Sequence, residues 1–182
     1  MSASSDFARC AAAWGALVAH RRLRSPKDNV GARLRFADGS SSFVFRETAV
    51  AGTDTSDPTL LVIGFRLAAL GSNRLLHAGF RRECVLHTPL FAGFPGFRSK
   101  LWVDDVETGL YRGVYEWDGG DLARRYAARM VGLLAPFSSR GTARSQVVEG
   151  VPRDAFLARP EDVATRGEGD WWRLAEPIAR VA

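Results

Sequence analysis

The chain has 182 residues, of which 46% are hydrophobic, and a formal net charge of +5. This length and apolar content suffice for one domain with a proper core, and no apolar run approaches the roughly 18 residues that a membrane span requires. The first residues do not form a signal peptide, because Asp6 precedes the apolar stretch and no cleavage site follows it. We therefore expect a cytoplasmic protein that does not associate with membranes.

The positive charge is spread along the whole chain. Arginines occur from Arg9 to Arg180 without a dense cluster, and Lys27 and Lys100 are the only lysines. Nucleic-acid binding predicts a basic stripe or patch, which no segment supplies. We therefore expect no nucleic-acid partner. Lys100 is noteworthy as a rare lysine inside an alternating strand, although a solvent-facing lysine is an equally good interpretation.

The first third of the chain predicts a helix followed by a β-hairpin. Residues Asp6–Arg24 carry apolar side chains at helical spacing. Two alternating segments, Ala32–Phe36 and Ser42–Arg46, flank an Asp-Gly pair, which is a strong hairpin signal. We expect residues 1–57 to form an N-terminal appendage.

Residues 58–150 predict the main domain. The periodicities indicate, in chain order, strand Leu60–Leu67, helix Arg74–His87, strand Gly96–Asp104, strand Leu110–Trp117, helix Leu122–Leu134 and strand Thr142–Val148. This βαββαβ order predicts an α+β protein with a ferredoxin-like antiparallel sheet. The irregular tail, residues 151–182, contains Trp171 and Trp172, and adjacent tryptophans need a surface to cover, on this domain or on a partner.

Four motifs of this domain resemble a known superfamily. They are Phe94-Pro-Gly-Phe, Ser99-Lys-Leu-Trp, Glu107-Thr-Gly and Arg112-Gly-Val-Tyr-Glu-Trp. With them, the chain resembles the dimeric α+β barrel superfamily, particularly the YdhR-like branch of the antibiotic-biosynthesis-monooxygenase group and similar proteins of actinobacteria. The resemblance implies a homodimer in which two sheets pair, with a pocket between each sheet and its helices. It favours a fold more strongly than an activity, because such a scaffold hosts many functions.

RNA-recognition domains are a competing ferredoxin-like interpretation. The segment Arg112–Trp117 resembles their third-strand motif. However, Leu61 and Val62 stand where the first strand of those domains needs an aromatic platform, and Glu116 would repel phosphate. RNA binding is therefore disfavoured.

Strand alternation predicts which side chains could line a pocket. Lys100 and Trp102 lie on one face of their strand with Arg98 and Asp104, whereas Phe97 and Leu101 lie on the other. Tyr115 and Trp117 share a face of the next strand. A mixed aromatic and cationic lining suits a polyphenol or polyketide, because the rings stack and Lys100, or Arg66 of the first strand, stabilises an enolate or phenolate. The alternative is that the tryptophans only fill a core or an interface.

The first helix of the main domain adds four candidate residues, which are His77, Phe80, Glu83 and His87. Glu83 and His87 are four residues apart and can meet on one helical face, so that either His77 or His87 could act as a general base. A metal site is disfavoured, because two side chains make an incomplete ligand set. His87 could equally interact with the helix dipole at the C-terminal end.

The functional hypothesis combines these residues with what the sequence lacks. There is no nucleotide-binding, nucleophile-elbow or paired-cysteine motif, so we expect no cofactor and no metal. The resemblance implies a small-molecule tailoring enzyme of secondary metabolism, foremost a cofactor-independent monooxygenase acting on an aromatic or polyketide-like substrate. Two alternatives are a non-oxidative cyclase or isomerase using the same pocket, and a non-catalytic ligand-binding or assembly protein.

Overall fold

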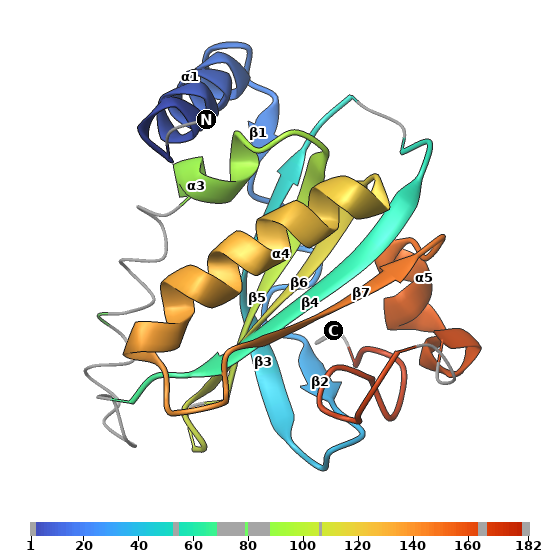
Figure 1. Ribbon diagram of the computed structural model, residues 1–182. Coiled ribbons are helices and arrows are strands. Elements are labelled where there is room, and N and C mark those ends of the chain that lie inside the picture. The colour runs from blue at the N-terminus through green and yellow to red at the C-terminus, as the bar shows by residue number, and fades with distance from the viewer. Residues whose placement is uncertain are drawn as a thin grey trace.

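The computed structural model describes residues 3–52, 55–68, 79, 88–105, 107–163 and 167–179. Figure 1 shows a single twisted sheet with one long helix across it. The elements in chain order are α1 (Ala3–Ala19), β1 (Leu23–Arg24), β2 (Arg33–Arg35), β3 (Ser41–Val50), β4 (Pro58–Arg66), α3 (Thr88–Ala92), β5 (Phe97–Asp105), β6 (Leu110–Asp118), α4 (Gly120–Leu134), η1 (Ala135–Phe137), β7 (Arg144–Glu149), α5 (Arg153–Ala158) and η2 (Pro160–Val163).

The sheet has a ferredoxin-like core with an extension at one edge. Its strands follow the order β1-β3-β5-β6-β4-β7, with β2 paired to β3, and all pairs are antiparallel. The run β5-β6-β4-β7 is the arrangement that a βαββαβ chain produces, which confirms the predicted fold class. The N-terminal hairpin joins this sheet through β3, so β5 and β6 become central strands. The predicted helix Arg74–His87 lies outside the described residues, apart from Gly79.

Two element boundaries differ by four residues or more from those predicted from the sequence. Helix α1 ends at Ala19 rather than Arg24, because Arg21 has a positive φ of 50° and turns the chain into β1. Strand β3 continues to Val50, well beyond Arg46, because its second half pairs with β5. Both differences depend on pairing partners that are distant in sequence. No described helix has both the length and the apolar character needed to cross a membrane.

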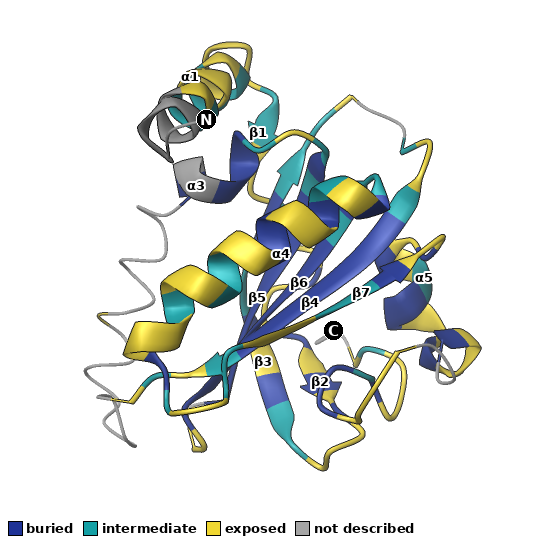
Figure 2. Cartoon of the chain, viewed as in Figure 1, coloured by how far each residue is buried: buried dark blue, intermediate teal, exposed yellow. Residues whose placement is uncertain are grey.

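One face of the sheet packs against α4 (Figure 1). Inward-facing residues of β4, such as Leu61 and Ile63, belong to an apolar cluster with Ala123, Tyr126 and Ala127 of the helix. These three residues recur at i, i+3 and i+4, so α4 presents one apolar stripe to the sheet. The opposite side of α4 is exposed (Figure 2). We call this side of the sheet the helix face.

The chain's own C-terminal segment covers the other face of the sheet, which we call the tail face. Trp172 is fully buried there and stacks on Phe156 of α5, with ring centroids 6.2 Å apart. Leu174 forms an isolated β-bridge with Phe36 of the N-terminal hairpin. Both tryptophans therefore cover this chain's own sheet. The homodimer, with the sheet-to-sheet pairing that the resemblance implies, stays a prediction.

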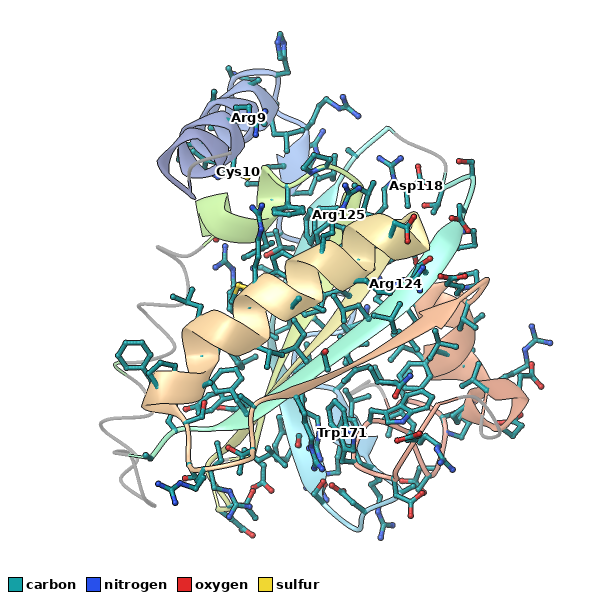
Figure 3. All side chains as sticks on the ribbon, in the orientation of Figure 1. Arg9, Cys10, Asp118, Arg124, Arg125 and Trp171 are labelled. Carbon is teal, nitrogen blue, oxygen red and sulfur yellow. The ribbon has the colours of Figure 1, made fainter. Side chains whose placement is uncertain are left out.

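A glycine in β4, Gly64, allows the C-terminal segment to pack closely on the sheet. Trp171 lies directly over Gly64, where an added Cβ would come within 2.9 Å of the indole Cζ3 atom. Arg112 of the neighbouring strand β6 fixes the main chain of Trp171, because its Nε donates a hydrogen bond to the Trp171 carbonyl at 2.9 Å. Figure 3 shows Trp171 within the C-terminal segment, away from α4. Glycine at this position thus permits close contact between the strand and the indole ring.

A buried ion pair anchors the start of the C-terminal segment. The Arg153 guanidinium lies 2.8 Å from the Glu47 carboxylate, and both side chains are almost completely buried. Glu47 also accepts a hydrogen bond from the Asn29 amide, and the Arg153 backbone N–H donates to Glu116. Breaking such a pair is costly because it leaves one uncompensated buried charge. The tail is therefore attached to the hairpin strand by specific polar contacts as well as by apolar packing.

Candidate functional site

The register between β5 and β6 determines which predicted site residues share a face. Lys100 pairs with Tyr115, and Trp102 pairs with Gly113. Paired residues project to the same side of a sheet, so Lys100, Trp102 and Tyr115 lie together on the helix face. Trp117, two residues beyond Tyr115, lies there as well. The structure thus gathers four of the predicted site residues on one surface.

A β-bulge changes the predicted face of Phe97. Strict alternation places Phe97 with Leu101, opposite Lys100. In the structure Phe97 pairs with Trp117 and Ser99 with Glu116, so Arg98 is left between them as the bulged residue. A bulge reverses the alternation of the residues before it, and Phe97 therefore packs on the helix face. The alternation-based prediction for Phe97 was wrong for this reason.

Lys100 lies inside a group of aromatic rings. Its Nζ atom is 3.1 Å from the centroid of a Trp102 ring, 4.6 Å from that of Phe91 and 4.8 Å from that of Tyr115. Its residue exposure is only 6%. Aromatic faces attract a cation most strongly when both are removed from water. The Lys100 ammonium is thus largely removed from water beside aromatic faces, where electrostatic interactions are stronger than in water.

Polar groups from neighbouring strands border this aromatic group. Thr48 of β3 is opposite Lys100 and accepts a hydrogen bond from the Trp102 Nε1–H at 3.3 Å. Asp104 is buried on the same face of β5, opposite Tyr111. The guanidinium of Arg46 lies 5.6 Å from the Trp102 ring centroid. The helix face therefore carries charged and hydroxyl groups beside its rings, which a purely structural aliphatic face would not require.

Tyr115 and Tyr126 close the side of the site next to α4. Their hydroxyl groups are 3.4 Å apart and their ring centroids 5.6 Å apart. Burial raises the pKa of Tyr126 well above 10, and the neighbouring Tyr115 adds to the shift. Tyr126 is therefore a neutral hydroxyl at physiological pH, able to donate a hydrogen bond but not to act as a base.

Trp117 lies deeper in the cluster than Lys100. It is fully buried, and its ring contacts Phe94, Phe97 and Tyr126 with centroids 5.8, 5.8 and 4.8 Å away. These tilted and edge-to-face arrangements are those that aromatic residues prefer in a core. Trp117 therefore supports the rings that surround Lys100, and a direct contact with substrate stays a prediction.

The remaining predicted residues are not part of this group. Arg66 is exposed at the end of β4, where it pairs with Leu110. Trp117 pairs with Thr59, near the opposite end of the same strand. His77, Phe80, Glu83 and His87 lie outside the described residues. Within the described ranges no three His, Cys, Asp or Glu side chains gather as a metal ion would require.

Sequence reasoning missed Phe91, Thr48 and Tyr126 as neighbours of the site. Phe91 belongs to α3, a short helix that begins at Thr88, one residue after the end of the predicted helix Arg74–His87. Thr48 reaches the site only because β3 pairs with β5. Tyr126 lies within the predicted helix Leu122–Leu134, and its i, i+3 spacing with Ala123 was the available signal.

The solved structures that are similar to this chain include the following three. A ferredoxin-fold protein related to antibiotic biosynthesis monooxygenases, from Listeria monocytogenes 4b F2365, is 11% identical, with a TM-score of 0.42 over 67% of this chain and 80% of that one. A heme-degrading enzyme from Listeria monocytogenes is 11% identical, with a TM-score of 0.43; the match covers 71% of this chain and 97% of that one. A monooxygenase-like protein from Listeria innocua is 13% identical, with a TM-score of 0.41; the match covers 69% of this chain and 81% of that one.

No family model matches the sequence, and no curated protein matches it. The ferredoxin-like assignment therefore rests on the strand order and register of this sheet.

Proposed function

We propose that the chain is a small-molecule tailoring enzyme of secondary metabolism, a cofactor-independent monooxygenase acting on an aromatic or polyketide-like substrate. The observation that carries the proposal is the buried Lys100 ammonium surrounded by Trp102, Phe91 and Tyr115. Aromatic rings provide stacking surfaces for a planar substrate, and the cation favours its deprotonated form. The resemblance of the sequence to YdhR-like proteins of actinobacteria supports the same class.

The proposed chemistry uses the substrate itself as the electron donor. A base removes a proton from an activated ring methylene, and Lys100 stabilises the resulting enolate or phenolate oxygen. The carbanion reacts with O2 at that carbon, which becomes a carbonyl. One oxygen atom enters the product, and the other leaves as water with the two methylene hydrogens. His77 and His87, with Glu83, stay the predicted bases.

The proposed enzyme includes a homodimer, as the superfamily resemblance implies. The tail face is occupied by residues 151–163 and 167–179 of the same chain. Pairing of the two sheets, as the resemblance implies, would require this segment to leave the tail face. Sedimentation equilibrium of the full chain measures this directly, and a monomer at all accessible concentrations would remove the dimer from the proposal.

Oxygen consumption with anthrone-type and naphthol-type substrates tests the activity. We expect one O2 consumed per quinone formed, and a loss of roughly 100-fold in kcat/KM for Lys100→Met, because that variant lacks the charge that stabilises the enolate. Lys27→Met is the matched control, because Lys27 is the only other lysine, is exposed and lies far along the chain. Equal activity of both variants would rule out the role of Lys100.

A second candidate function is non-catalytic binding of the same class of ligand. The described part of the site favours it, because the rings around Lys100 supply stacking surfaces and a cation, whereas the predicted bases His77 and His87 lie outside the described residues. Calorimetry with the same substrates separates the two: saturable binding without O2 consumption or product supports the binder. Product formed under strict anaerobiosis indicates a cyclase or isomerase instead. If no substrate of the panel is bound or turned over, the proposed function is overturned.

A further inference from the structure

A groove lies on the molecule between α1 and the turn that joins α3 to β5. It has a volume of about 420 Å³, which is within the range of roughly 300–1,000 Å³ typical of small-molecule sites. We call it the α1 groove. It is lined by Ala13, Ala16, Leu17, His20, Arg22, Val50, Ala92, Gly93, Phe94, Pro95, Phe97 and Arg98.

The lining separates into apolar walls and basic groups. Side chains of α1, of the α3–β5 turn and of the end of β3 form the apolar part. The polar side chains are His20, Arg22 and Arg98, and none of the described lining residues is Asp or Glu. Such a combination of an apolar wall and one sign of charge complements a ligand with an apolar body and an anionic group.

Two basic residues have fixed positions. Arg22 Nε donates to the Ala51 carbonyl at 3.2 Å, which leaves the terminal nitrogens of its guanidinium for other partners. Arg98 is the bulged residue of β5, and β-bulges re-aim side chains beside functional sites. Arg98 Nη2 contacts Asp118 at 2.5 Å, whereas its Nε is buried and has no hydrogen-bond partner among the described residues.

We propose that the α1 groove binds an organic anion with an apolar body, of the class of a medium-chain carboxylate. The alkyl chain lies along the apolar walls contributed by Ala16, Leu17 and Phe94. The carboxylate accepts hydrogen bonds from Arg22 and Arg98, a charge-assisted interaction about twice as strong as a neutral one.

This site is separate from the aromatic group around Lys100. Phe91 of α3 contacts Lys100 on one side and Phe97, which lines the groove, on the other, so its ring lies between the two places. Binding in the α1 groove therefore does not depend on the proposed oxygenase activity, and either one can fail without the other.

Calorimetry of the full chain with three ligands of equal chain length tests the proposal. The ligands are dodecanoate, dodecanol and dodecyltrimethylammonium, each below its micelle concentration. We expect dodecanoate to bind with one site per chain, dodecanol roughly tenfold more weakly, which corresponds to about 1.4 kcal/mol, and the cationic ligand not at all. Equal affinities for all three would show that only the apolar wall acts, and no binding of dodecanoate would overturn the proposal.

Two pairs of variants locate the ligand. Ala16→Trp fills the α1 groove, whereas Ala12→Trp places the same side chain at an exposed position of α1 outside the lining. Arg22→Gln removes a lining charge, whereas Arg24→Gln removes an exposed charge outside the lining. We expect at least tenfold weaker dodecanoate binding for the first member of each pair and unchanged binding for the second. Equal effects within both pairs would contradict the location, and thermal unfolding checks that all four variants fold.

Discussion

Arg112 of the central strand β6 donates a hydrogen bond from Nε to the main-chain carbonyl of Trp171, 2.9 Å away and 59 residues along the chain. The same guanidinium donates to Asp38, Ser40 and Ser42 of the N-terminal hairpin. Burial lowers the pKa of Arg112 to about 10, an effect partly offset by Asp38, so the side chain stays charged at neutral pH. One buried cation thereby joins three parts of the chain on the tail face.

Replacing this cation tests how much it contributes to stability. We expect Arg112→Met to lower the free energy of unfolding by roughly 3 kcal/mol, because it leaves Asp38 and the Trp171 carbonyl without their donor. Arg35→Met is the control, since the Arg35–Glu176 pair spans 3.9 Å with both side chains half exposed or more; it should cost less than about 1 kcal/mol. Urea denaturation measures both, and equal losses would contradict the role assigned to Arg112.

Gly93 positions α1 on the rest of the molecule. A Cβ at this position would lie 1.8 Å from the Cys10 main-chain oxygen, and Figure 3 shows Cys10 where α1 faces α3. Because the obstacle is backbone, Gly93→Ala must displace the helix. We expect faster proteolysis within α1 and loss of dodecanoate binding in the α1 groove. Gly132→Ala, at a position of α4 with open space, should change neither measurement.

The lowered pKa of Asp118 predicts a loss of folding stability in acid. The backbone N–H of Asp57 is the main cause that lowers the pKa of Asp118, and Arg98 and Ser56 add to it. The unfolded chain therefore binds the proton more tightly, and stability present near pH 5 is lost as the pH falls toward about 3. In Asp118→Asn this loss should be smaller. Urea denaturation at pH 5 and pH 3 checks this prediction. The difference in free energy of unfolding between the variant and the wild type must be smaller at pH 3 than at pH 5.

The raised pKa of Tyr126 predicts a loss of folding stability in alkali. Because its pKa is raised in the folded chain, the unfolded chain releases that proton first, and stability falls as the pH rises above about 10. The chain has three tyrosines. At pH 11 the folded protein should show less tyrosinate absorbance at 295 nm than the protein in guanidinium. Tyr126→Phe should remove most of that difference, and a difference retained in the variant would assign the shift to another tyrosine.

Local patterns predicted much of the fold. The Asp-Gly turn of the hairpin and the strands around Leu61 and Tyr115 depend on neighbours in sequence, and their positions were close to those observed. The position of Trp171 over Gly64 depends on contacts across more than a hundred residues, which no periodicity encodes. The same limit applies to the site: alternation grouped Lys100 with Trp102, whereas the bulge at Arg98 follows from pairing between strands.

The tail face also bears on how the protein is made. Residues that this face must bury, such as Leu60 and Val114, are synthesised well before Trp172, which covers them. At about 5–20 residues per second, residues 151–179 require roughly 1.5 to 6 seconds of translation. During that interval an apolar sheet surface is present on the ribosome-bound chain without its cover. The nascent protein therefore has a window in which chaperone binding competes with aggregation, and the window closes only when the tryptophan pair emerges.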